Sequence, residues 1–260
     1  MPSLLEITEY TDTFLAIHRF KDYAPNGLQV EGKSEVKKIV TGVTASQALL
    51  DAACSKHADA ILVHHGYFWA NEDARVVGMK RKRLTTLLQN EISLLAYHLP
   101  LDAHAQVGNN AQLALLLEIQ IDGALGTDDR SACGNYGRLM QPISAEGFKH
   151  LIDSKLERIC THIAPGNFSA SDSAHSMINS IAWCTGAGQN FIQMAVEQNF
   201  DAFISGEISE QTTHIAREAG IHYFAAGHHA TERYGIRALG EHLEYKFGLQ
   251  HEFIDIDNPA

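Results

Sequence analysis

Residues 38–65 read KIVTGVTASQALLDAACSKHADAILVHH, and this stretch predicts the fold class. Its beginning, residues 38–44, is rich in β-branched residues and is typical of a strand, while Ser46 can cap a helix over residues 47–56. Residues 59–63 form a short run that is apolar after Asp59, as expected of a strand covered on both faces. A strand, a helix and a strand joined by short loops make a βαβ unit, which favours a parallel sheet in an α/β protein.

Further elements of the same kind flank this stretch. Apolar residues at helical spacing predict an opening helix over residues 4–20, and proline and glycine in residues 24–27 predict a turn after it. After the βαβ unit, we expect a helix over residues 80–90 and a third strand over residues 92–97. The first half of the chain is therefore predicted to be one α/β domain.

The same order of elements returns in the second half of the chain. When residues 142 positions apart are aligned, Ile181 falls on Ile39 and Asp201 falls on Asp59. Further along, a shift of 130 places His228 on the histidine at position 98. We interpret this self-similarity as a duplication that produced two related α/β halves. The elements predicted for the second half are strands over residues 181–184, 201–204 and 221–226 and helices over residues 191–198 and 212–219.

Two polar stretches interrupt this order. Residues 123–135 contain Gly, Asp and Ser and predict a domain boundary near residue 125, and residues 161–176 are similarly loop-like. The predicted domains are residues 1–125 and residues 126–260, each of an ordinary size for a domain.

Composition narrows the classes of function. The chain has 260 residues, and 20 Lys and Arg against 31 Asp and Glu give a net charge of -11. Such a charge disfavours general binding to nucleic acids or anionic membranes. No apolar run approaches the roughly 20 residues needed to cross a bilayer, and the N-terminal residues do not resemble a secretory signal. We therefore expect a cytoplasmic protein whose scattered cysteines are reduced: Cys54, Cys133, Cys160 and Cys184.

Histidines and carboxylates follow three of the predicted strands. The strand over residues 59–63 ends in a His-His pair, and the strand over residues 92–97 is followed by HLPLD. The strand over residues 221–226 is followed by GHHATE. Because the carboxyl ends of parallel strands gather at one edge of a sheet, these side chains are expected to converge. They are His64, His65, His98, Asp102, His228, His229 and Glu232.

This set of donors is suited to divalent metal ions. Imidazole and carboxylate groups bind Zn, Fe, Mn or Ni, and no cysteine belongs to the set. His228 and Glu232 are four residues apart, so on a helix they would share one face, as would His98 and Asp102 if Pro100 permits a helix there. Adjacent histidines on an extended backbone point to different sides. Two metal ions bridged by a carboxylate would use both members of the pair, so we expect a dinuclear site.

Five motifs carry a resemblance to a known family. They are FKDYAPNGLQVEG (20–32), TGVTAS (41–46), VHHGYFW (63–69), HLPLD (98–102) and GHHATER (227–233). In this order over nearly the whole chain, they resemble the dinuclear-metal family named "GTP cyclohydrolase 1 type 2", also called the Nif-three-like family, in its short bacterial form.

The resemblance implies both an architecture and a set of ligands. It implies two related α/β domains with a dinuclear metal site in the cleft between them, and toroidal homohexamers whose metal sites face an inner cavity. Asp102 would bridge the two ions, while His98 and His229 would be neighbours of the ligands. The implied metal ligands are His64, His65, Asp102, His228 and Glu232.

The function that follows is a metal-dependent hydrolase. Two divalent ions would activate a water molecule and orient an electrophile. If the family name describes the chemistry, the small-molecule substrate is a guanine nucleotide attacked at C8, with opening of the imidazole ring. Lys80–Arg83 and Arg233 are candidates for binding the triphosphate, although a solvated helix face also explains Lys80–Arg83.

Three residues are candidates for catalysis beside the metal ligands. Glu207 takes the place of His65 when the halves are aligned and follows the strand over residues 201–204. It would act as a general base or as the partner that orients a ligand imidazole. His98 is another candidate, and His214 is a weaker one.

Other classes of function remain open from the sequence. The same ligands would serve a non-catalytic regulatory or assembly protein that only binds a metal, or a redox di-iron centre. An open coordination position beside a pocket would favour the hydrolase, whereas a site fully ligated by protein would favour the regulatory protein.

Overall fold

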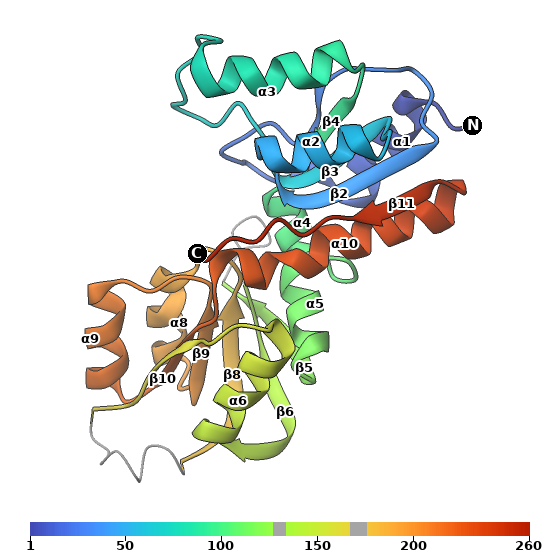
Figure 1. The fold of residues 1–260 in the computed structure, drawn as a ribbon. Coiled ribbons are helices and arrows are strands. Elements are labelled where there is room, and N and C mark those ends of the chain that lie inside the picture. Colours follow the sequence, from blue (N-terminus) through green and yellow to red (C-terminus); the bar gives the residue numbers. More distant parts are fainter. Residues whose placement is uncertain (127–133, 167–175) are drawn as a thin grey trace. The chain divides into compact units, whose positions relative to one another are not determined.

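The computed structural model describes residues 1–126, 134–166 and 176–260 (Figure 1). The chain forms two α/β units, each with its own sheet, and the predicted fold class is confirmed. Cys133 and parts of the two stretches expected to be loops lie outside the described residues. Unit 1 comprises Met1–Gly108 and Arg233–Asp257, and unit 2 comprises Asn109–Glu232 and Asn258–Ala260.

These units differ from the predicted domains, which were separated by a single boundary near residue 125. The chain enters unit 2 at Asn109 and returns to unit 1 at Arg233, so unit 1 is built from two separate segments. The physical reason is that the last strand, β11 (Gln250–Phe253), pairs in parallel with β2 (Lys38–Thr44) and completes the sheet of unit 1.

A mostly parallel sheet forms the centre of unit 1. Its strand order is β1-β4-β3-β2-β11, and only β1 runs antiparallel to its neighbour. The remaining strands are β1 (Gly27–Val30), β3 (Ala60–His65) and β4 (Ser93–Ala96). The helices are α1 (Leu4–Phe14), η1 (Ile17–Arg19), α2 (Gln47–Ser55), α3 (Gly78–Gln89), α4 (Leu99–Ala103) and, from Arg233 onward, most of α10 (His228–Phe247).

Consecutive strand residues of unit 1 belong to two different core clusters. Ile39 lies in the cluster that includes residues of α1 and α10, whereas Val40 lies in the cluster that includes residues of α2 and α3. Likewise, Leu62 lies in the first of these clusters and Ile61 in the second. Burial on both faces explains why residues 60–63 are apolar throughout.

The opening helix is shorter than predicted. It ends at Phe14, and a 3-10 turn over Ile17–Arg19 follows. The reason is that Ala16 has a φ of 50°, a left-handed conformation that a right-handed helix cannot contain.

Unit 2 contains a mixed sheet. Its strand order is β5-β6-β8-β9-β10-β7, in which β8, β9 and β10 are parallel and the other pairings are antiparallel. The strands are β5 (Ile119–Leu125), β6 (Gly134–Ser144), β7 (Thr161–Ile163), β8 (Met177–Cys184), β9 (Ala202–Ser205) and β10 (His222–Ala225). The helices are α5 (Asn109–Leu116), α6 (Ala145–Leu156), η2 (Gln189–Phe191), α8 (Ile192–Glu197) and α9 (Glu210–Ala219).

The prediction of a loop over residues 161–176 is wrong for its first three residues. Thr161–Ile163 form the edge strand β7, which pairs antiparallel with β10. Proline at position 165 and glycine at position 166 dominate the sequence pattern, and three residues are too few to show a strand period.

The two units repeat the same local hydrogen-bonding pattern. Ile39 pairs with Ala60 between β2 and β3, and the residues 142 positions later, Ile181 and Ala202, pair between β8 and β9. The aspartates that precede β3 and β9 also match. Oδ2 of Asp59 accepts hydrogen bonds from the backbone N–H groups of residues 37 and 38, and Oδ2 of Asp201 accepts them from residues 179 and 180.

The later shift differs by one residue from the predicted value. Ser93 of β4 and His222 of β10 occupy equivalent register positions, next to Ala60 and Ala202, and they are 129 residues apart. The strand ends that carry the histidines are therefore equivalent, while His98 and His228 themselves lie beyond the paired strand residues.

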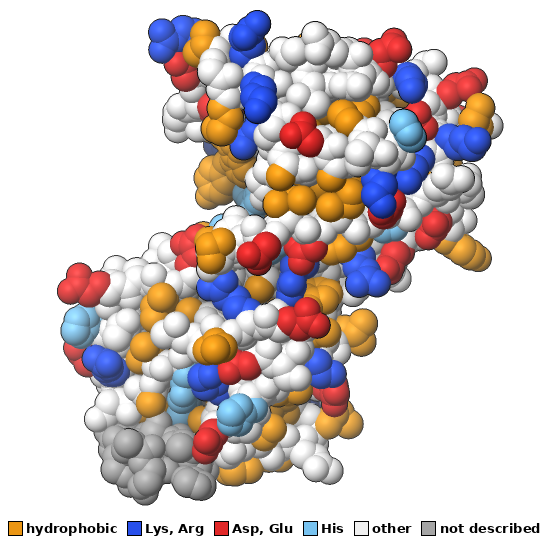
Figure 2. All heavy atoms as spheres, in the orientation of Figure 1, with side chains coloured by type: hydrophobic (Ala, Val, Ile, Leu, Met, Phe, Trp, Pro, Cys, Tyr) orange, Lys and Arg blue, Asp and Glu red, His pale blue; other side chains and the backbone are white. Residues whose placement is uncertain are grey.

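Charges of both signs are interspersed on the face seen in Figure 2, where Lys and Arg side chains lie among Asp and Glu side chains. Among the described residues, no helix combines the length and the apolar character that crossing a membrane requires.

Candidate metal centre

His64 and His65 close strand β3, at the carboxyl end of the parallel strands of unit 1. Nδ1 of His64 lies 2.9 Å from the backbone oxygen of Tyr97, so Nδ1 carries the proton and Nε2 carries the lone pair. Nδ1 of His65 lies 3.1 Å from Oγ1 of Thr44. His64 is fully buried. Both rings are thus oriented through Nδ1 by an oxygen atom.

The short helix α4 places Asp102 beside His64. His98 is the N-cap residue, and Pro100 lies in the first turn, where a proline does not interrupt helical hydrogen bonds. Asp102 is buried, and its Oδ1 lies 3.6 Å from Nε2 of His64. The helix that Pro100 had left in question is therefore present.

A carboxylate orients His98. Nδ1 of His98 lies 2.7 Å from Oδ1 of Asp22, which leaves Nε2 of His98 with the lone pair. Burial raises the pKa of Asp22, but the hydrogen bonds and the charge of His98, with further donors, outweigh it and lower the pKa to about 2. One nitrogen from each of His64, His65 and His98 lies within 4.8 Å of the others, close enough for three histidines to share a metal ion.

Aromatic rings border these histidines in unit 1. The Trp69 ring is 5.0 Å from the His98 ring and 6.0 Å from the His65 ring, and Tyr23 is 6.3 Å from His98. The loop that carries Trp69 is conformationally unusual, because Phe68 has a φ of 65°. Such strained residues are frequent at functional sites.

Unit 2 contributes a second group of donors at the start of α10. Nε2 of His228 lies 3.2 Å from Oε2 of Glu232, one helical turn away, and Nδ1 of His228 lies 2.7 Å from Oε1 of Glu207. Burial alone would lower the pKa of His228, but Glu232 and Glu207 raise it to about 9. Gly186 has a φ of 61°, and a Cβ at this position would collide with Oε1 of Glu232. The glycine therefore permits the close approach of its backbone to Glu232.

The four histidines share one arrangement. In each of them Nδ1 faces an oxygen atom, which comes from Tyr97, Thr44, Asp22 or Glu207. When Nδ1 carries the proton, the lone pair on Nε2 can bind a metal, and outer partners of this kind are typical of metal-binding histidines. No role was predicted for Thr44 or Asp22, although both belong to the quoted motifs. The Tyr97 carbonyl could not be predicted because a backbone oxygen leaves no sequence signal.

The remaining candidate residues differ in burial and in their ion pairs. His229 is buried, and His214 is exposed on α9. Lys80 forms an ion pair with Glu72 at 3.4 Å, and Arg233 forms one with Asp255 at 3.0 Å.

The basic residues on α3 differ in the same way, because some have partners and others are exposed. The Arg83 guanidinium lies over the Tyr67 ring, and Arg81 and Lys82 are exposed. The cluster is thus a partly paired helix surface.

Taken together, the fold and these donor groups define an α/β protein with residues suited to metal binding. The family model described as Duf34/NIF3 (NGG1p interacting factor 3) matches residues 2–259, and the chain belongs to this family. The resemblance drawn from the five motifs is therefore confirmed.

Named relatives cover almost the whole chain. A protein of Vibrio cholerae named "GTP cyclohydrolase 1 type 2 homolog" is 54% identical over 98% of this chain and 99% of its own length. A Pseudomonas aeruginosa protein of the same name is 50% identical over 99% of each chain. Among solved structures, the protein ybgI, titled "unknown function", has 50% identity and a TM-score of 0.92, covering 99% of this chain and all of that one. TTHA1606 from Thermus thermophilus has 32% identity and a TM-score of 0.86 over 99% of this chain and 100% of its own.

Proposed function

We propose that this protein is a metal-dependent hydrolase that uses two divalent metal ions, held by His64, His65, Asp102, His228 and Glu232. The observation that supports the proposal best is the shared orientation of the histidines, each bound through Nδ1 to an oxygen atom. In the neutral ring this leaves the lone pair on Nε2 directed away from that oxygen, and in His228 an ion would take the place of the proton on Nε2. His228 and Glu232 alone are fewer than the three or four protein ligands that zinc sites use, which favours a centre that also includes the unit 1 residues.

The two ions would supply Lewis acidity and a nucleophilic water at neutral pH. Asp102 would help to hold both ions, as the family resemblance implies, because a carboxylate offers two oxygen atoms. Asp22 and Glu207 hold the rings of His98 and His228 through Nδ1. His98 and Glu207 remain the candidates for moving a proton, and the donor set accepts Zn, Fe, Mn or Ni.

The proposed substrate is a purine nucleotide whose imidazole ring is opened by hydrolysis at C8. The relatives' printed name supports this choice, since it refers to GTP cyclohydrolase. The rings of Trp69 and Tyr23 beside His98 also support it, because aromatic side chains stack on planar bases. We further propose that the protein acts in the cytoplasm as a toroidal homohexamer, as the family resemblance implies.

The test combines metal analysis with turnover. Purified protein loaded with each of the four metals in turn is assayed for hydrolysis of GTP and other nucleotides, and its metal content is measured. We expect about two ions per chain in the active form, and loss of both an ion and activity in Asp102→Ala. Asp51→Ala, which changes an exposed aspartate on α2, is the matched control.

The outcome also separates the alternative functions. Two bound ions without turnover of any nucleotide would favour the regulatory or assembly protein. Activity that survives in Asp102→Ala would contradict the proposed mechanism. Light scattering of the purified protein tests the hexamer.

A further inference from the structure

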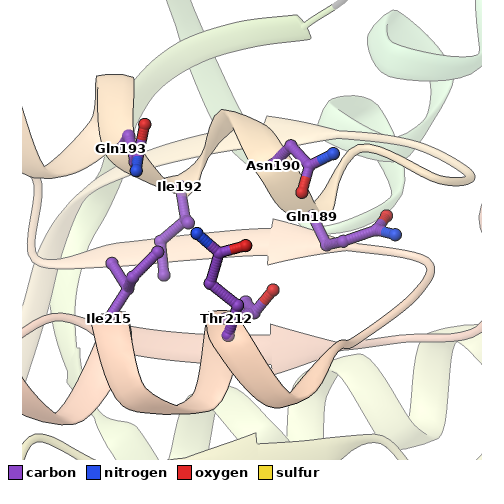
Figure 3. A pocket seen from close by; sticks show the side chains of 7 residues that line it. Gln189, Asn190, Ile192, Gln193, Thr212 and Ile215 are labelled. Carbon is purple, nitrogen blue, oxygen red and sulfur yellow. The ribbon is translucent and has the colours of Figure 1, made fainter.

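Carboxamide side chains dominate a pocket of about 240 Å³ in unit 2 (Figure 3). The pocket lies where η2 and α8 meet α9, and no ionisable side chain is among the described residues that line it. Ile192 and Ile215 supply apolar surface. The carboxamides are those of Gln189, Asn190, Gln193 and Gln211.

This lining selects for a particular chemistry. A carboxamide offers both an N–H donor and a carbonyl acceptor, so four of them match a ligand edge that alternates donors and acceptors. Without a cationic side chain, the pocket has no group to neutralise a phosphate or a carboxylate among its described lining residues. Its volume is below the usual range of about 300–1,000 Å³ for sites that hold drug-sized ligands. A neutral ligand about as large as one or two fused rings is therefore the best match.

Gln189 provides an independent sign of a missing partner. Its Nε2 donates to Oε2 of Glu207 at 3.4 Å. Because an ionised carboxylate only accepts hydrogen bonds, this contact fixes which end of the carboxamide is nitrogen. Oε1 of Gln189 is buried and has no hydrogen-bond partner among the described residues. A buried acceptor without a partner is unfavourable, and a ligand could donate a hydrogen bond to it once the Gln189 side chain turns towards the pocket.

The same contact links the pocket to the donor group of unit 2. Glu207 receives the hydrogen bond from Gln189 through one oxygen and contacts Nδ1 of His228 through the other. A ligand that engages Gln189 would therefore act on the residue that orients a proposed metal ligand.

We propose that this pocket binds the lactam edge of a neutral planar heterocycle, the base of the substrate. The inference rests on the proposed function and identifies where the substrate's base is recognised. In a guanine base, the lactam edge carries an N–H donor next to a carbonyl acceptor, and C8 lies on the opposite side of the fused rings. Recognition of the lactam edge in the pocket therefore leaves the imidazole ring outside it.

The experiment measures binding of guanosine, which has no phosphate, to the metal-loaded protein by calorimetry. Gln193→Ala and Gln211→Ala remove exposed carboxamides of the pocket, and Gln198→Ala removes an exposed one just after α8 as the matched control. We expect at least about tenfold weaker binding in each pocket variant and less than about twofold change in the control. N1-methylguanosine, which blocks the lactam edge, should bind at least about tenfold more weakly than guanosine, whereas 7-deazaguanosine should bind nearly as well.

Several results would overturn the inference. They are undetectable binding of guanosine to the wild-type protein, unchanged binding in both pocket variants, or equal binding of N1-methylguanosine. If one pocket variant fails to fold, the other variant and the methylated nucleoside still decide the question. Metal content, measured on the same samples, separates the two proposals. Two ions with no guanosine binding contradict only the pocket, and pocket-dependent guanosine binding without metal contradicts only the hydrolase.

Discussion

Nδ1 of His98 lies 2.7 Å from the carboxylate of Asp22, which also accepts hydrogen bonds from the Asn26 side chain and from the backbone N–H of Leu99. All of these partners are donors. The carboxylate therefore determines which nitrogen of His98 is protonated, and it ties the loop before β1 to the start of α4.

Replacing this carboxylate should weaken metal binding. In Asp22→Asn, the new amide N–H₂ group faces donors, so the His98 ring loses its fixed orientation. A nitrogen of His98 lies close enough to those of His64 and His65 to share their ion, and loss of the outer partner of a metal-binding histidine typically costs 10–100-fold in metal affinity, so we expect a decrease of at most that size. Competition with a chromophoric chelator measures it. Asp73→Asn, in an exposed loop of the same unit, is the control, and equal affinities of the two variants would contradict the role of Asp22.

Glu207 can be assigned to positioning or to proton transfer by comparing two substitutions. The carboxamide introduced by Glu207→Gln can still accept a hydrogen bond from Nδ1 of His228, whereas the methyl group introduced by Glu207→Ala cannot. If Glu207 only positions His228, we expect Glu207→Gln to keep metal affinity within about tenfold of wild type and to retain most of its kcat, with Glu207→Ala weaker in both. A kcat equally low in both variants, with metal content intact, would instead identify a general base.

The equivalent aspartates of the two units should make similar contributions to stability. Asp59 and Asp201 each accept two backbone hydrogen bonds at the start of the strand pairs β2–β3 and β8–β9. Substituting either one by Ala leaves these N–H groups without their acceptor, so we expect a loss of about 1–3 kcal/mol in the free energy of unfolding. Denaturant titration measures it. Asp51→Ala should change it by less than about 0.5 kcal/mol, as expected of a surface substitution.

Acid should destabilise the protein through His162. Nε2 of His162 lies 2.9 Å from Nδ1 of His222, and Nε2 of His222 lies 2.7 Å from Oγ of Ser176. Burial, then the nearby His222 and Lys149, lower the pKa of His162 to about 4. In the unfolded chain, His162 therefore binds a proton near pH 6.5, whereas in the folded chain it binds one only near pH 4.

The sign of this effect follows from the direction of the shift. The stabilisation is complete above about pH 6.5 and is lost as the pH falls towards 4, by about 3 kcal/mol at most. Urea unfolding across this range should show a steeper decline for the wild-type protein than for His162→Gln, which cannot titrate. Parallel declines in the two proteins would show that His162 contributes nothing to the pH dependence.

Most of the parallel strands were predictable, but β11 and the antiparallel strands were not. Strands such as β3 are buried on both faces, and their apolar runs are visible in the sequence. By contrast, β6 spans Gly134–Ser144 with a burial pattern that follows neither alternation nor a continuous apolar run. β11 is short and contains His251 and Glu252, so its place in the sheet depends on pairing with β2, which no local pattern reveals.

The candidate metal ligands were visible because they follow predicted strands directly. The residues that orient them were harder to find, since their role depends on contacts far along the chain. Asp22 and His98 are 76 residues apart, and Thr44 and His65 are 21 apart. The pocket of unit 2 could not be predicted either, because glutamine and asparagine on helices usually indicate only a solvated surface.

The matching register of β2–β3 and β8–β9 makes one difference between the two units stand out. Position 65 closes β3, whereas the corresponding position 207 lies two residues beyond the end of β9 and carries glutamate in place of histidine. One strand end therefore presents an imidazole, while its counterpart presents an anion that steers the ring of His228. The two halves are not interchangeable, so a chimera carrying two first halves would repeat the scaffold but lose this pairing of carboxylate and imidazole.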